Sequence, residues 1–250
     1  MALPRHPLRA LVRLIGFLVI VVIALADLGM RSLAGRLDMK GRARWLHRWT
    51  RRALRWMGIT VQTDGQPPGA GVIVSNHLGY LDVFVLSAIA PTVFVSNDDV
   101  SRWPLAGALA RMSGTVFIDR RRRADVIRVG EALAPIIEAG QPVALFLEGT
   151  STGGDRVLPF HSSLLAPAVR KGWTVTPAHI IYSGEGITTG EMAYWGDDVF
   201  LPHFLEVMGL RRGEARVCFG RTRRAEGDRR ELAVQLHEEV CTLGGHDAAP

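Results

Sequence analysis

Apolar residues follow different patterns in different parts of the chain, and the first pattern is an unbroken run. Residues 14–26 read LIGFLVIVVIALA, which predicts a helix. At about 1.5 Å per residue this run reaches ~20 Å, short of the ~30 Å hydrocarbon core of a bilayer. If the helix continues through Asp27 to Leu33 it reaches about 20 residues, and Asp27 lies at the membrane interface.

A second pattern, between residues 40 and 57, places apolar side chains at helical spacing among basic ones. The apolar positions are Trp45, Leu46, Trp49, Ala53, Trp56 and Met57. A basic, Trp-rich amphipathic helix is typical of a surface helix attracted to anionic lipid. The alternative is a helix that packs its apolar stripe on the domain core and exposes its Arg face. We expect residues 1–57 to be membrane-attachment helices.

The N-terminus also fits a cleaved signal peptide. Arg5, Arg9 and Arg13 form a basic region before the apolar run, and residues 24–26 (ALA) resemble a cleavage site. The basic helix that follows argues against cleavage.

From residue 70 onward, short β-branched runs alternate with helical patterns. Strands are predicted at residues 72–75, 92–96, 115–119, 143–147, 174–181 and 215–220. Helices are predicted at residues 82–90, 103–111, 124–139, 162–170 and 229–243. This alternation predicts an α/β fold for residues 58–250, with a mostly buried mixed sheet flanked by helices.

Charge is distributed unevenly, and this bears on the partners of the protein. The net charge of +6 comes from residues 1–60, which carry twelve basic residues against two acidic ones; the rest carries eighteen against twenty-two. An apolar run directly before the basic helix indicates a bilayer and not a nucleic acid. Cys218 and Cys241 are too few for a disulfide framework or a cysteine-rich zinc site. The sequence has no P-loop and no HExxH motif.

Candidate chemistry begins at residues 76–82 (NHLGYLD), directly after the first strand predicted in this α/β part. A turn there lets Asp82 fold back to His77, fix its tautomer and stabilise the imidazolium that forms when His77 takes a proton. No Ser or Cys nucleophile is adjacent, so the pair suits direct attack by a substrate hydroxyl. Alone, the spacing also fits a structural His with Asp82 as a helix cap.

Other short segments of the sequence carry polar residues where a predicted strand ends. Residues 114–120 (GTVFIDR) end in Arg120, and a basic loop follows. Residues 146–151 (FLEGTS) carry Glu148, and Arg156 follows in the chain. Pro177 interrupts an apolar strand-like run, which predicts an edge, a bulge or a local break of the strand.

In this order the blocks NHxxxxD, IDR, FxEGT and VxP resemble the glycerolipid acyltransferase family, over roughly residues 70–220. The resemblance implies transfer of a fatty acyl group from a thioester of acyl carrier protein or coenzyme A to a lysolipid hydroxyl at the membrane, with no further cofactor and no metal. It implies a general base at His77 with Asp82 as its partner. The implied acceptor-binding residues are Arg120, Glu148, Gly149, Thr150 and Arg156, and the implied site-shaping residues are Asn76, Ser151 and Pro177.

The chain departs from the pattern of the lysophosphatidate enzymes at Ser151, where they usually carry Arg, and at Leu147, where the family often has Pro. The run 148–164 (EGTSTGGDRVLPFHSSL) resembles the branch that acylates lyso-ornithine lipid, whose acceptor has a carboxylate in place of a phosphate. The resemblance favours 1-acylglycerol 3-phosphate as acceptor, with lyso-ornithine lipid the alternative. It also implies a cytoplasmic membrane enzyme whose site faces the cytoplasm. A non-catalytic lipid-binding scaffold is the remote alternative, against which the intact His77 and Asp82 argue.

Overall fold

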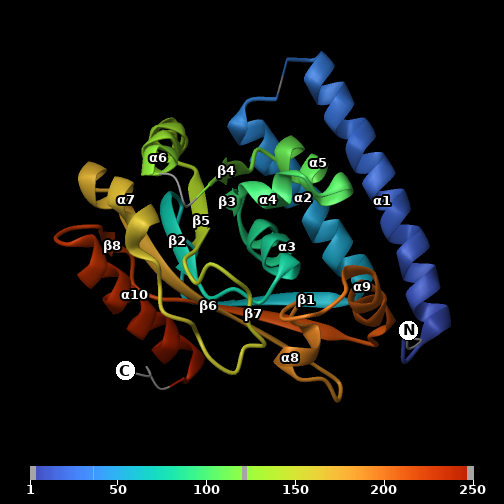
Figure 1. Ribbon diagram of the computed structural model, residues 1–250. Coiled ribbons are helices and arrows are strands. Elements are labelled where there is room, and N and C mark those ends of the chain that lie inside the picture. The colour runs from blue at the N-terminus through green and yellow to red at the C-terminus, as the bar shows by residue number, and fades with distance from the viewer. Residues whose placement is uncertain (1–3, 36, 120–122, 247–250) are drawn as a thin grey trace.

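A mixed sheet forms the centre of the computed structural model, which describes residues 4–35, 37–119 and 123–246 (Figure 1). Its strands are β1 Ile59–Asp64, β2 Gly71–Ser75, β3 Val93–Asn97, β4 Val116–Ile118, β5 Pro142–Phe146, β6 Thr174–Gly184, β7 Gly213–Phe219 and β8 Arg223–Arg224. They lie in the order β1-β7-β6-β2-β5-β3-β4, and β8 pairs with β6. The pairs of β6 with β7 and with β8 are antiparallel, and the other pairs are parallel. The predicted mixed α/β sheet is confirmed.

Helices cover both faces of the sheet. On one face lie α1 Pro7–Leu33, α2 Met39–Met57, α3 Tyr80–Ile89 and α9 Phe200–Gly209; on the other lie α6 Arg123–Glu138, α7 Ala166–Lys171 and α10 Arg229–Gly244 (Figure 1). Shorter helices, α4 Asp98–Ser101, α5 Pro104–Met112, the 3-10 turn Ser162–Leu165 and α8 Thr189–Met192, fill the connections.

Strand alternation divides the core between these faces. In β2, Ile73 packs with α3, whereas Val72 and Val74 pack with α6 and α10. Successive strand residues point to opposite faces, and both faces are covered, so β2 and β5 are buried along their whole length.

The register of β2 and β5 decides where the chemistry lies. The strands are parallel and Ser75 pairs with Phe146, so the chain leaves both strands at the same edge of the sheet. Residues 76–82 and 148–150 therefore emerge side by side. Strand β4 is separated from β5 by β3, which places the block that begins at Asp119 farther along the same edge.

Strand β1 and helix α9 were not predicted from the sequence. Strand β1 is exposed along most of its length, and its apolar residues are only Ile59 and Val61. Helix α9 contains Pro202 in its first turn, where the backbone N–H has no intrahelical partner and proline is tolerated.

Pro177 lies inside β6, between β2 and β7, so the expected strand break or edge is not found there, although the pairing is interrupted at this residue on one side. Its carbonyl accepts from the amide of Gly220, and a residue in a strand directs its N–H and C=O to the same side. On that side β8 pairs with β6 at Val175 and β7 begins pairing at Ala178. The missing donor thus falls in the gap between two partner strands.

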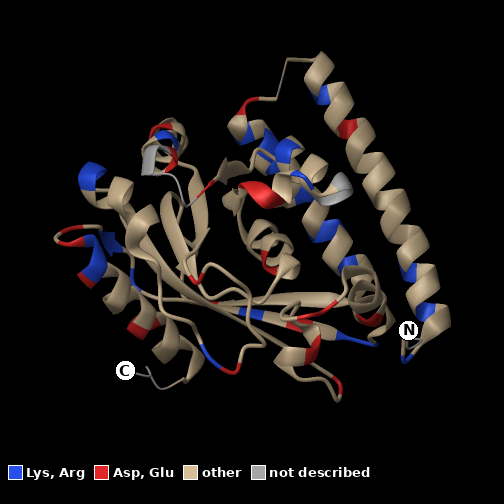
Figure 2. Ribbon diagram, viewed as in Figure 1, with Lys and Arg blue, Asp and Glu red and all other residues tan. Residues whose placement is uncertain are grey.

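The N-terminal helices pack on each other and on the domain. Helix α1 extends to Leu33, the continuation that the sequence left open, and it is the one helix in the described ranges that is long and apolar enough to cross a membrane. In α2, Trp45, Ala53 and Met57 are buried, because α1 and α3 cover them. Much of this stripe therefore packs on the protein, whereas Trp56 is 43% exposed and the Arg face of α2 also remains exposed (Figure 2).

Candidate active site

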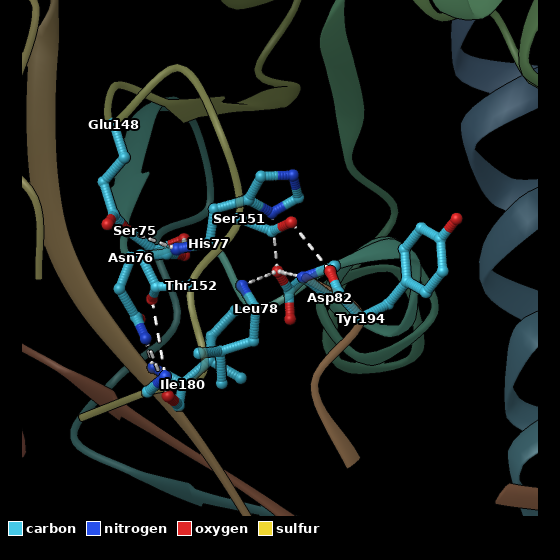
Figure 3. A network of polar contacts seen from close by, with 12 residues as sticks. Ser75, Asn76, His77, Leu78, Asp82, Glu148, Ser151, Thr152, Ile180 and Tyr194 are labelled. Carbon is cyan, nitrogen blue, oxygen red and sulfur yellow. Dashed lines mark hydrogen bonds and ion pairs between the residues drawn. The ribbon is translucent and has the colours of Figure 1, made fainter. Parts of the chain in front are cut away.

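His77 and Asp82 form a hydrogen-bonded pair at the carboxyl edge of β2 (Figure 3). His77 Nδ1 lies 2.7 Å from Asp82 Oδ2. An ionised carboxylate only accepts hydrogen bonds, so Nδ1 carries the proton and Nε2 presents a lone pair. The imidazole stacks on the ring of Phe146, with 4.2 Å between centroids. Asp82 is fully buried, whereas a quarter of the His77 side chain is exposed. This arrangement suits a general base that faces a substrate.

Asp82 also folds the turn that carries His77. Its Oδ2 accepts from the amide of Leu78 at 2.7 Å and from the amide of Gly79 at 3.0 Å. Gly79 has φ +135°, and a Cβ there would lie 2.8 Å from the Cβ of Tyr194. The conformation and the space both require glycine at this position. The sequence spacing therefore reflects one closed turn.

Neighbouring loops bind the remaining backbone groups of this turn. The amide of His77 donates to Glu148 Oε1 at 2.6 Å, and its carbonyl accepts from the amide of Thr152 at 2.9 Å. The carbonyl of Leu78 accepts from the amide of Tyr194 at 2.7 Å. With these bonds every backbone N–H and C=O of His77 and Leu78 has a partner, so the base is held rigidly.

Glu148 is a buried carboxyl that joins two loops. Its Oε1 accepts from His77, and its Oε2 accepts from the amide of Leu158 at 2.8 Å. Burial raises its pKa to about 7, although the hydrogen bonds from Leu158 and His77 oppose that rise. Both oxygens are thus occupied by backbone donors. The implied role in acceptor binding remains a prediction, and the visible role is to hold the turn.

The other predicted acceptor residues are spread around this turn. Gly149 and Thr150 are exposed in the turn after β5, and Arg156 is exposed in the following loop. Asp119, at the end of β4, precedes Arg120, which lies outside the described residues.

The predicted site-shaping residues differ in their contacts. Asn76 binds both backbone groups of Ile180, its Nδ2 donating to the carbonyl at 2.9 Å and its Oδ1 accepting from the amide at 2.7 Å. Ser151 Oγ donates to the carbonyl of Tyr194 at 2.7 Å. Pro177 packs against Gly220, farther back in β6. Asn76 and Ser151 thus lie beside the His77 turn and fix the segments around it.

Two residues of this network were not predicted from the sequence. The amide of Tyr194 binds the turn that carries His77, and the hydroxyl of Tyr182 donates to Asp82 Oδ1 at 2.5 Å. Burial, with the nearby charge of Asp82, raises the pKa of Tyr182 well above its ordinary value. Neither residue has a local signal, because Tyr182 is 100 positions from Asp82. Among the described residues, no cluster of three His, Cys, Asp or Glu side chains offers a metal site.

The chain matches the family model described as Acyltransferase over residues 58–181. A lyso-ornithine lipid O-acyltransferase of Pseudomonas aeruginosa is 34% identical over 83% of this chain and 80% of the relative. The chain belongs to the acyltransferase family. A second lyso-ornithine lipid O-acyltransferase, from Rhizobium meliloti, is 35% identical over 81% of this chain and 75% of its own length. A 1-acyl-sn-glycerol-3-phosphate acyltransferase of Neisseria meningitidis is 30% identical over 72% of each chain.

A solved structure shares this acyltransferase fold. The 1-acyl-sn-glycerophosphate acyltransferase of Thermotoga maritima superimposes with a TM-score of 0.70 over 95% of both chains, at 20% identity. At that identity the match concerns the fold, including the helices that precede the sheet.

Proposed function

We propose that the protein is a lysolipid O-acyltransferase in which His77 is the general base. The hydroxyl oxygen of the lysolipid attacks the carbonyl carbon of an acyl thioester while His77 Nε2 takes the hydroxyl proton. The carbon–sulfur bond then breaks, and the proton passes to the departing thiolate. Asp82 stabilises the imidazolium between these steps. The observation that carries the proposal is the 2.7 Å contact between His77 and Asp82, beside which the Ser151 hydroxyl is bound to the carbonyl of Tyr194.

Lyso-ornithine lipid is the acceptor that we favour. Position 151 offers no cation, and the Ser151 hydroxyl is already bound to the carbonyl of Tyr194. A phosphate monoester with nearly two negative charges calls for convergent cations, whereas one Arg pairs bidentately with a carboxylate. The relatives from Pseudomonas and Rhizobium carry the same acceptor in their names. These points reverse the order in which the sequence alone ranks the two acceptors.

Lysophosphatidate is the second candidate acceptor. The Neisseria relative is named for it, and Arg156 is exposed in the loop that follows Ser151. Arg156 is the described residue best placed in the chain to replace a missing cation, so its removal separates the two candidates.

Membrane attachment through one leaflet supports a lipid acceptor. Helix α1 exposes Leu11, Val12, Ile15, Leu18, Val19, Val22 and Ile23 on one side. Its other side is tied to the protein in both halves of the helix: Arg9 donates to the carbonyl of Gly209 at 3.1 Å, and Trp45 donates to the carbonyl of Ala24 at 2.9 Å. A helix bound in both halves to one domain lies along a bilayer surface and does not cross it.

Basic residues near this helix favour the cytoplasmic leaflet, whose lipids are anionic. Lys and Arg gather on α2 and near the N-terminal end of α1 (Figure 2). A cytoplasmic site also gives access to a thioester of acyl carrier protein or coenzyme A, which we keep as the proposed donors.

An acyl-transfer assay tests the proposed reaction and its acceptor. The full chain in lipid vesicles is given a labelled acyl thioester, on either carrier, and a panel of lysolipids that includes lyso-ornithine lipid and lysophosphatidate. We expect the highest kcat/KM with lyso-ornithine lipid, and His77→Ala serves as the inactive control. Absence of transfer to every lysolipid would contradict the proposal.

Substitution at position 151 tests the acceptor directly. Ser151→Arg adds a cation beside the turn, so we expect the ratio of lysophosphatidate to lyso-ornithine lipid turnover to rise about tenfold, the effect of ~1.4 kcal/mol. Thr63→Arg, on the exposed strand β1, adds the same charge elsewhere and leaves the ratio unchanged. If wild type prefers lysophosphatidate and Arg156→Ala removes that preference, the lyso-ornithine assignment is wrong.

A further inference from the structure

Asp82 receives hydrogen bonds on both of its oxygens, and only Oδ2 is occupied by the catalytic turn. Oδ2 accepts from His77, Leu78 and Gly79, whereas Oδ1 accepts from the hydroxyl of Tyr182. Asp82 and Tyr182 are 0% and 1% exposed. Within the described part of the chain, the hydroxyl is the donor that serves Oδ1.

The backbone of β6 brings Tyr182 to this point. Strand β6 pairs with β2 as far as Ala178, opposite Ser75, and then continues to Gly184 beyond the end of β2. The hydrogen-bond ladder between β2 and β6 ends at Ala178. Beyond it, the side chain of Asn76 binds the N–H and C=O of Ile180 in place of a strand residue. Tyr182 lies two positions further and so shares the face of Ala178 and Ile180, the face on which α3 packs.

This geometry constrains the carboxylate plane. A buried carboxylate oxygen without a donor loses its hydration with no compensation. Removal of the Tyr182 hydroxyl therefore favours rotation of the Asp82 carboxylate toward another donor. That rotation moves Oδ2 away from His77 Nδ1.

We propose that Tyr182 is a positioning residue of the acyltransferase: it fixes the Asp82 carboxylate so that Oδ2 orients His77 for proton transfer. The inference rests on the proposed role of His77 as base. Tyr182 belongs to none of the motif blocks, and its hydroxyl binds Asp82, so its effect on His77 passes through Asp82.

Tyr182→Phe tests this role, because it removes the hydroxyl and keeps the ring. We expect kcat to fall about tenfold, the size of one hydrogen bond to a charged group, and KM for both substrates to stay within about twofold. Thr176→Val is the matched control: Thr176 is buried on the same strand, and its hydroxyl binds Thr222. An equal loss of kcat in Thr176→Val would reduce Tyr182 to a general stability role.

A double-mutant cycle with Asp82→Asn shows whether Tyr182→Phe lowers kcat through Asp82 or through an unrelated change in the protein. If Tyr182 acts through the carboxylate, Tyr182→Phe costs less than about twofold once Asp82 is Asn. A full tenfold cost in both backgrounds overturns the proposal. Thermal melting of each variant establishes that the folded protein is compared.

A spectroscopic readout makes the test independent of turnover. The His77 Nδ1 proton, bound to a carboxylate, gives a downfield proton resonance that should move upfield in Tyr182→Phe and stay in place in Thr176→Val. In Asp82→Asn, which retains Tyr182, the Tyr182 hydroxyl proton should shift as its acceptor changes. An unmoved His77 resonance in Tyr182→Phe contradicts the positioning role. If wild type shows these resonances and transfers no acyl group, the proposed function fails while the positioning contact stands.

Discussion

Asp82→Asn separates the charge of the partner from its geometry. Two backbone N–H groups, of Leu78 and Gly79, point at the Oδ2 position. An amide NH₂ placed there would oppose two donors, so the carbonyl oxygen of Asn takes that position. The NH₂ then faces the hydroxyl of Tyr182, which has a lone pair to accept from it. His77 Nδ1–H keeps an oxygen acceptor and the correct tautomer.

The expected loss of kcat follows from this orientation of the amide in Asp82→Asn. The variant loses the charge that stabilises the imidazolium and keeps the hydrogen bond. A hydrogen bond to a charged group is worth roughly 1.5–3 kcal/mol against about 1 for a neutral one. The difference corresponds to a rate loss of about 10- to 100-fold. In hydrolytic triads where the amide leaves the imidazole in the wrong tautomer, the loss is about 10⁴, so the two cases are distinguishable.

The assay is kcat at saturating acyl thioester and lysolipid, with thermal melting to confirm folding. Asp228→Asn is the matched control, because Asp228 caps α10, and Asn caps helices as well as Asp does. Wild-type kcat in Asp82→Asn would reduce Asp82 to a helix cap. A loss near 10⁴ would refute the orientation argued from Leu78 and Gly79.

Two further predictions concern stability and the membrane. Because burial raises the pKa of Glu148 from 4.5 to about 7, the folded protein holds this proton more tightly than the unfolded chain. The free energy of unfolding that this group contributes is fully present below about pH 4.5 and falls, by roughly 3 kcal/mol at most, as pH rises to 7. Glu148→Gln should therefore flatten that part of a plot of melting temperature against pH. An unchanged slope contradicts the raised pKa of Glu148. Replacing Ile15, Val19 and Val22 of α1 by Ser should lower the fraction bound to anionic vesicles in a flotation assay, with Ser at exposed Val234 of α10 as control; equal binding by both variants contradicts attachment through α1.

Local spacing explains why the contact between His77 and Asp82 was predictable. His77 and Asp82 lie in one turn, so a separation of five residues and a glycine suffice to define their geometry. The paired strands β2 and β5 were equally clear, because burial on both faces leaves continuous apolar runs. The apolar run 14–26 predicted a helix there, whereas its continuation to Leu33 was left open and is seen in the structure.

The apolar stripe of α2 shows where such reasoning ends. Helical spacing of Trp45, Ala53 and Met57 predicts an apolar face, and this prediction is confirmed. The spacing does not specify what covers that face, because lipid and protein both bury apolar side chains. Here α1 and α3 cover it, which only the tertiary structure reveals.

Tyr182, which orients the site, is under a weaker constraint on residue type than His77, the proposed base. The proposed proton acceptor is His77, whose imidazole must lie in this turn against Asp82. The task of Tyr182 is only to place one donor at Asp82 Oδ1, and any side chain on β6 that reaches this oxygen with an O–H or N–H satisfies it. A sequence motif therefore marks the reacting pair, while the donor that orients it is defined by the register of β6 beyond Ala178. For the same reason, a search for positioning residues in this fold should begin with the strand extension beside the turn and not with the motif itself.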